Sequence, residues 1–211
     1  MEMLKNSSVE AIEEVIAGRS ALHWACFNNL SKVGKELLKK DPSLASSVDY
    51  DGMTPLHLSC VAGSTSLVDS ILHKSPSALY IEDRQGKLAI HHAIENGHLD
   101  LSRRLVTQHH HSIDVKDSNN ATLLHLACRN DDHKMVKLLL EHKDAPDASA
   151  MDKDGNKPIH VAAEFDGASA IGALLSKGVE NYIKERGAKN VYWLPNGPDL
   201  NNFKFKKKVS L

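Results

Sequence analysis

The stretch MTPLHLSC, at residues 53–60, recurs along this chain at a nearly fixed distance. Related octapeptides stand on both sides of it: RSALHWAC (19–26), KLAIHHAI (87–94), ATLLHLAC (121–128) and NKPIHVAA (156–163). Each has a histidine at its fifth place, and these residues are His23, His57, His91, His125 and His160. The intervals between successive histidines are therefore 34, 34, 34 and 35 residues. Such a period indicates one structural unit stacked several times.

Each octapeptide is expected to begin a short helix. In the second copy, Thr54 can cap the helix N-terminus with its hydroxyl, and Pro55 suits the first helical position. Gly63 stands six residues after His57, where a left-handed residue would end the helix after about two turns. The matching places of the other copies hold residue types that tolerate positive φ: Asn29, Gly97, Asp131 and Asp166.

A second, apolar helix is expected to follow in each unit. Leu67, Val68, Ile71 and Leu72 have the spacing of an inward stripe on a helix, and residues 135–140 repeat that spacing. Polar, turn-prone stretches then lead to the next octapeptide. Each of these stretches has an acid eight residues before the histidine, and these acids are Asp49, Asp83, Asp117 and Asp152. We expect the stretches to form protruding turns.

These units resemble ankyrin repeats, whose T-P-L-H-x-A motif lies in a unit of about 33 residues with a β-turn and two antiparallel helices. The resemblance covers about residues 15 to 180 in five copies. It implies an all-α solenoid of stacked helix-turn-helix units with protruding β-turns. The extra residue of each unit falls after the second helix and should leave the stacking unchanged.

We expect the chain to be divided into three parts. Residues 1–18 would form an N-terminal capping helix, because Val9, Ile12 and Ile16 have helical spacing with acids on the other side. Residues 19–178 would form the five repeats. Residues 179–211 would form a C-terminal cap and a basic tail, in which Pro195 and Pro198 stand where a helix would be needed.

Composition restricts the class of protein. The 211 residues are 41% hydrophobic and 25% charged, which suits an ordered domain, and the net charge of -1 predicts no global attraction to nucleic acid or anionic membrane. The acidic N-terminus lacks the pattern of a secretory signal, and no run of 18 apolar residues occurs. We therefore expect a soluble, monomeric protein of the cytoplasm, with the nucleus as the alternative compartment.

The sequence contains no evident catalytic or metal site. Equivalent histidines in stacked units lie on the order of 10 Å apart, too far to converge on one zinc ion or one catalytic group. The resemblance instead implies that each histidine bonds to backbone near a turn and ties units together. Cys26, Cys60 and Cys128 occupy the last octapeptide place and are expected to be small buried side chains. The run of His109, His110 and His111 is expected to be a solvated loop, so we expect no cofactor and no enzyme activity.

Function is therefore expected on a surface. The resemblance implies a concave face, formed by the turn tips and the exposed sides of the first helices, that binds a protein partner. Its candidate contacts are Phe27, Tyr50, Asp51, Met53, Val61, Arg84, Gln85, Lys87, Glu95, Arg129, Lys153 and Phe165. The chain would then be a non-enzymatic adaptor, inhibitor or effector.

Two alternatives remain open. Residues 178–211 carry seven Lys or Arg against three acids, a local charge of +4, and could bind nucleic acid or another acidic surface. The chain could also be the targeting part of a larger enzyme. The sequence does not identify the partner, because this kind of scaffold binds many unrelated proteins.

Overall fold

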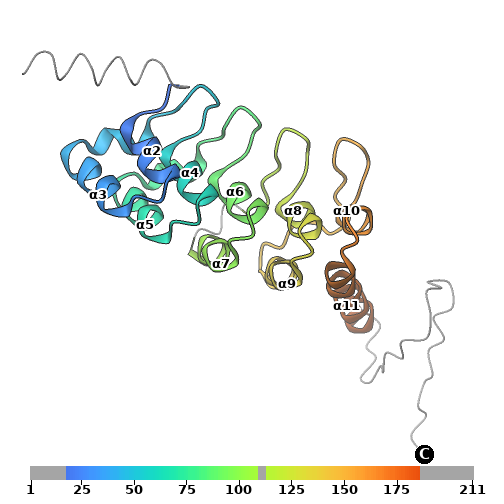
Figure 1. The fold of residues 1–211 in the computed structure, drawn as a ribbon. Helices are drawn as coiled ribbons and strands as arrows, with labels where there is room; N and C mark the ends of the chain where they lie inside the picture. The colour runs from blue at the N-terminus through green and yellow to red at the C-terminus, as the bar shows by residue number, and fades with distance from the viewer. Residues whose placement is uncertain (1–17, 109–112, 186–211) are drawn as a thin grey trace, which may run out of the picture.

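Short first helices of equal length alternate with longer second helices in the computed structural model, which describes residues 18–108 and 113–185 (Figure 1). The first helices, each of seven residues, are α2 (Ala21–Phe27), α4 (Pro55–Val61), α6 (Ala89–Glu95), α8 (Leu123–Arg129) and α10 (Pro158–Glu164). The second helices are α3 (Ser31–Lys40), α5 (Thr65–Lys74), α7 (Leu99–Gln108), α9 (His133–Glu141) and α11 (Ala168–Glu185). The predicted all-α repeat solenoid is confirmed.

Each first helix begins at the histidine octapeptide for a local reason. In α4, the Thr54 hydroxyl accepts a hydrogen bond from the His57 backbone N–H, and Nδ1 of the His57 ring accepts one from the Thr54 N–H. The two residues thus satisfy each other's free backbone donors at the helix start. Pro55 occupies the first turn, where no N–H is needed.

Each first helix ends two residues before the predicted left-handed residue. Asn29, Gly63, Gly97, Asp131 and Asp166 all have positive φ, between 51° and 71°. Just after each of them, a backbone N–H bonds to a carbonyl five residues earlier, as from Ser64 to Ser59 at 2.8 Å. This is the pattern of a left-handed helix end, which reverses the chain into the second helix.

The helices form two layers. The first helices pack side by side in the order α2, α4, α6, α8 and α10, and the second helices lie beneath them (Figure 1). The loops that lead into α4, α6, α8 and α10 project from the same side of the first-helix layer (Figure 1). The predicted protruding turns therefore stand in a row.

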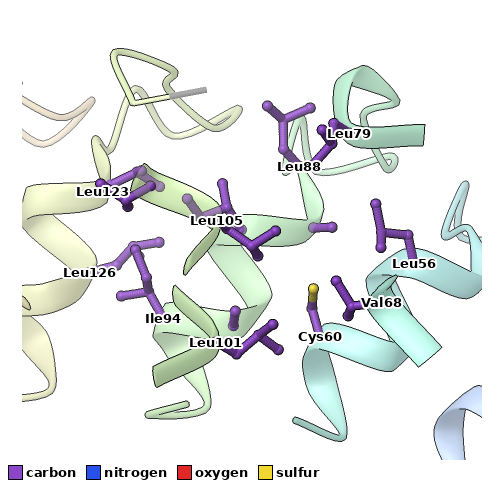
Figure 2. Close-up of a cluster of buried hydrophobic side chains, with 14 of the residues drawn as sticks. Leu56, Cys60, Val68, Leu79, Leu88, Ile94, Leu101, Leu105, Leu123 and Leu126 are labelled. Carbon is purple, nitrogen blue, oxygen red and sulfur yellow. The ribbon is translucent and has the colours of Figure 1, made fainter. Parts of the chain in front are cut away.

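The core is continuous from one repeat to the next. Leu56 and Val68 of the second repeat, Leu101 of the third and Leu123 of the fourth belong to one buried cluster (Figure 2). The Cys60 side chain lies in the same cluster and is fully buried, as predicted for that place of the octapeptide. A single helix pair could not bury these side chains, so the repeats stabilise one another by stacking.

The connections after the second helices differ along the chain. In the first two repeats the stretch that contains the extra residue forms a short 3₁₀ helix, η1 (Pro42–Ser46) in the first and η2 (Pro76–Tyr80) in the second. In the fifth repeat α11 continues through Gly178 to Glu185, so the domain boundary expected at 178 falls within a helix. The expected N-terminal cap, the His109 to His111 run, the proline-containing segment and the basic run near the C-terminus lie outside the described residues.

Candidate functional site

Carboxylates, buried in three of the turns and half-buried in the fourth, hold the protruding turns in shape. Asp83 Oδ1 accepts hydrogen bonds from the backbone N–H groups of Gln85 and Lys87, at 2.8 and 2.9 Å. Asp49, Asp117 and Asp152 accept the equivalent pairs in the other turns. The acids seen in the sequence therefore shape the turns from inside and do not form the outer surface.

Successive turns are joined through their backbones. The N–H of Arg84 bonds to the carbonyl of Asp51 at 2.9 Å, and that of Ser118 bonds to the carbonyl of Gln85 at 2.8 Å. The N–H of Lys153 bonds to the carbonyl of Asn119 in the same way, at 2.9 Å. Since the tips fix one another, the exposed side chains of Asp51, Arg84, Gln85 and Lys153 extend from a connected row.

The repeated histidines link each first helix to the turn of the following repeat. Nε2 of His23, His57 and His125 lies 3.0 Å from the carbonyl oxygens of Met53, Lys87 and Asn156, respectively. Because Nδ1 of each ring accepts a backbone N–H, Nε2 carries the proton and donates to the carbonyl. Burial lowers the pKa of His57 to about 4, so its ring is neutral at pH 7.

Two histidines depart from this pattern. Nε2 of His91 is buried and has no hydrogen-bond partner among the described residues, although Nδ1 accepts the Leu88 N–H at 3.0 Å. The His160 side chain is exposed, and within residues 18–108 and 113–185 its ring accepts one hydrogen bond, from the Lys157 N–H at 3.3 Å. Among the described residues, the inter-repeat bond expected from the resemblance is therefore present for His23, His57 and His125; the equivalent acceptor position for His160, about 30 residues later, lies outside those residues.

An aromatic cluster lies at the N-terminal end of the predicted binding face. The Trp24 and Phe27 rings meet edge to face, with centroids 6.3 Å apart and an interplanar angle of 87°. The Arg19 guanidinium lies 5.6 Å from both centroids and bonds to Asp49 at 3.0 Å. Phe27 nevertheless remains 46% exposed. These contacts hold the aromatic rings in place while leaving apolar surface open to solvent.

Tyr50 adds a second exposed ring beside this cluster. Its side chain is 57% exposed, and a Cβ built on Gly18 would lie only 2.7 Å from Tyr50 Cδ1. The ring therefore lies directly against the Gly18 backbone and is supported on one side. Exposed, supported aromatic rings are typical anchors of protein interfaces.

The centre of the predicted binding face is a network of paired charges. Lys87 Nζ lies 2.6 Å from Glu95 Oε1, and His92 Nε2 donates to Asp83 Oδ2 at 2.8 Å. The His92 ring also meets the His57 ring edge to face at 5.6 Å. Burial opposes ionisation of Asp83, but hydrogen bonds from the Lys87 N–H, the His92 ring and the Gln85 N–H outweigh it and lower its pKa. These charges are already compensated within the chain.

The remaining candidates differ in exposure. Met53 and Val61 are half-buried, and Met53 packs against the core. At the C-terminal end, the Arg129 guanidinium lies 4.8 Å from the centroid of the Phe165 ring, and Phe165 is 46% exposed. The structure thus separates the predicted contacts into two aromatic ends and a charged centre.

Several residues of this surface were not among the predicted contacts. Trp24 and His92 both follow the repeated histidine directly, a place that Leu58, Leu126 and Val161 fill elsewhere. The second histidine in KLAIHHAI replaces the apolar residue found at that place in three other copies, and this difference could have identified His92 from the sequence. No feature of the sequence identified Arg19, because its role depends on the side chain of Asp49, which lies 30 residues later in the sequence.

Comparisons with known proteins agree with this architecture. A family sequence model described as ankyrin repeats, in three copies, matches residues 2–83, 22–117 and 90–185. A tyrosine-protein kinase from Hydra vulgaris, HTK16, is 34% identical over 70 residues. That match spans 33% of this chain and 9% of the kinase, so the chain covers only a small part of that relative.

Residues 18–108 and 113–185 contain no group of three His, Cys, Asp or Glu side chains that could hold a metal ion. Within the same ranges, no helix is both long and apolar enough to cross a membrane.

Proposed function

Since this chain belongs to the ankyrin-repeat family, whose members are generally protein-protein interaction modules, we propose that it binds a protein partner on its concave face. The partner would lie along the turn tips and first helices, with its main anchor at the N-terminal aromatic cluster of Arg19, Trp24, Phe27 and Tyr50. The chain would act as an adaptor, inhibitor or effector without catalysis of its own, as a monomer in the cytoplasm or nucleus.

The observation that carries this proposal is the exposure of Phe27 and Tyr50, at 46% and 57%, on rings that neighbouring groups hold in place. Covering such rings removes apolar area from water, while little conformational entropy is lost because their positions are already restricted. The C-terminal pair of Arg129 and Phe165 offers a second, smaller contact of the same chemical kind.

The charged centre supports the same arrangement. Lys87 and Glu95 have side chains that are only 13% and 26% exposed, and they bind each other. A partner would have to separate this ion pair to use either charge, and the desolvation cost offsets much of the gain. The centre is therefore expected to contribute to partner choice and association rate more than to affinity.

Affinity capture from a cell lysate, with matched variants of the full chain, tests the proposal. Tyr50→Ala should abolish recovery of partners that the unchanged chain captures reproducibly. Tyr80→Ala is the control, because Tyr80 is 53% exposed but lies in η2, outside the turn tips and first helices. Equal loss with both variants, or no loss with Tyr50→Ala, would contradict a specific role for the concave face.

A second candidate is the targeting part of a larger enzyme, which the partial match to the Hydra kinase favours. The concave face would then bring a catalytic domain to its protein substrate. Expression of the gene in its source cells, followed by mass measurement of the product, tests this alternative: a polypeptide near the 23.2 kDa of this chain would exclude a fused catalytic domain.

Binding of nucleic acid through the basic tail remains the other alternative. Titration with DNA and RNA at low and moderate salt distinguishes it, because binding through lysines weakens steeply as salt rises. Absence of binding at low salt would exclude it.

A further inference from the structure

One face of α3 is exposed to solvent, whereas the equivalent faces of α5, α7 and α9 are buried. Two apolar places recur one turn apart in each second helix, and in the second to fourth repeats they hold Leu67 and Ile71, Leu101 and Leu105, and Met135 and Leu139. All six side chains are at most 3% exposed. In α3 the same places hold Val33, which is 50% exposed, and Leu37, which is half-buried.

The inner repeats show what normally covers this face. Leu67 of α5 packs on the preceding second helix so closely that a Cβ on Gly34 of α3 would lie 2.5 Å from Leu67 Cδ2. Contacts of this kind join α3 to α5, α7 to α9 and α9 to α11. Within residues 18–108 and 113–185, no element occupies the corresponding place beside Val33.

The charged side chains on this face of α3 restrict the kind of segment that could bind to it. Lys32 and Lys40, together with Val33, Glu36 and Leu37, line a shallow, open hollow of about 310 Å³ on this face. The exposed face of α3 also carries Lys35 and Lys39, so lysines outnumber the single acid. An amphipathic helix with apolar side chains on one face and acids on the other matches this surface.

We propose that residues 7–17 of this chain, SSVEAIEEVIA, bind to α3 in this way. They carry Val9, Ile12 and Ile16 at helical spacing, and their three charges are all negative, at Glu10, Glu13 and Glu14. Eleven helical residues would span about 16 Å, close to the length of about 15 Å expected for the ten residues of α3.

Two further observations favour this segment over a separate molecule. Only residues 18–20 separate it from the start of α2, so its local concentration near α3 is high. The ankyrin-repeat match also begins at residue 2, and therefore includes the segment in the repeat array. Residues 7–17 would then replace the missing second helix of a preceding repeat and bury Val33 and Leu37.

Disulfide cross-linking in the full chain tests the proposal. Ile12→Cys is combined with Val33→Cys or with Leu37→Cys, and the protein is oxidised mildly. The three native cysteines are buried and should not interfere. We expect one of these pairs to form an intramolecular bond in most molecules. The control combines Ile12→Cys with Lys39→Cys, whose side chain is 68% exposed and does not line the hollow, and it should cross-link at least tenfold less.

Stability measurements give an independent readout. Val33→Asp should lower the melting temperature by several degrees if the side chain is covered, whereas Lys137→Asp, on an exposed position of α9 in the fourth repeat, should leave it nearly unchanged. Dimers linked between two chains would show that a second copy covers α3. Equal cross-linking of all pairs, or an unchanged melting temperature in Val33→Asp, would show that residues 7–17 do not bind there.

Discussion

At the scale of single residues, the repeated histidines act as connectors between repeats. Their regular spacing favoured a structural role over a shared catalytic or metal site, and the structure shows His57 bonded to Thr54 in its own repeat and to Lys87 in the next. The exceptions were not visible in the sequence. Whether Nε2 of His91 finds an acceptor depends on how closely two neighbouring repeats approach each other at that point. The octapeptide KLAIHHAI contains no information on the distance between the repeats.

Replacing His57 by alanine should lower the free energy of unfolding by about 2 to 4 kcal/mol. The change removes two hydrogen bonds to buried backbone groups and leaves a cavity in a fully buried position. Urea denaturation measures the effect. His160→Ala is the matched control, because that side chain is exposed, and it should cost roughly 0.5 kcal/mol or less. Similar losses for both variants would contradict the connector role.

The three cysteines should react slowly with thiol reagents in the folded protein. Burial raises the pKa of Cys26 to about 11 and that of Cys128 to about 12, and it also raises the pKa of Cys60. The thiolate is the reactive form, so both accessibility and ionisation oppose labelling. Labelling with Ellman's reagent in buffer and in denaturant measures the difference. Rapid labelling of all three in buffer would contradict the packed octapeptides.

At the scale of elements, helix starts, helix ends and turns could be predicted because each depends on local chemistry. Positive φ occurs at Gly63 and Asp131, where the sequence offered residues that tolerate it. Side-chain partners across repeats could not be predicted in the same way. Arg19 with Asp49 and His92 with Asp83 are paired through the turn geometry, and a one-dimensional pattern contains no information on those distances.

The buried acids should be essential to the turns as acceptors rather than as charges. Asp117 accepts from the N–H groups of Asn119 and Ala121 at 2.8 and 2.9 Å. Asp117→Ala should therefore cost about 1 to 3 kcal/mol of unfolding free energy, because two backbone donors lose their partner. Asp117→Asn keeps an acceptor oxygen and should cost less than half as much. Equal losses in thermal or urea unfolding would show that the negative charge itself is required.

At the scale of the whole molecule, the repeat count and the all-α solenoid followed from the period of the histidines, because stacking requires each unit to bury the same places. The ends of the array were harder to predict. The sequence loses the octapeptide after residue 163, yet α11 continues to Glu185. The length of the last helix could not be predicted in the same way, because it has no later copy in the sequence for comparison.

Stability should fall as the pH is lowered from about 6.5 to about 4. Burial lowers the pKa of His57 and of His91 to about 4, from 6.5 in an exposed histidine. Between these values the unfolded chain binds protons that the folded chain does not, so acid favours unfolding. Each histidine contributes a slope of about 1.4 kcal/mol per pH unit inside the window, and its full contribution is present above pH 6.5.

Urea unfolding at several pH values measures this slope. His57→Ala should reduce it by the contribution of one histidine while lowering stability at pH 7. A free energy of unfolding that stays constant between pH 7 and pH 5 would contradict the assignment of neutral, buried rings.

The central claim is that a protein partner is anchored at the aromatic end of the concave face. The most direct test measures the dissociation constant of a captured partner for Phe27→Ala, Tyr50→Ala and Arg84→Ala, with the melting temperature of each variant. We predict that either aromatic change weakens binding by about 2 kcal/mol or more, about thirtyfold, and that Arg84→Ala costs roughly 1 kcal/mol or less. Melting temperatures should stay close to that of the unchanged chain. Full affinity in both aromatic variants with a large loss in Arg84→Ala would place the anchor in the charged centre and contradict this account.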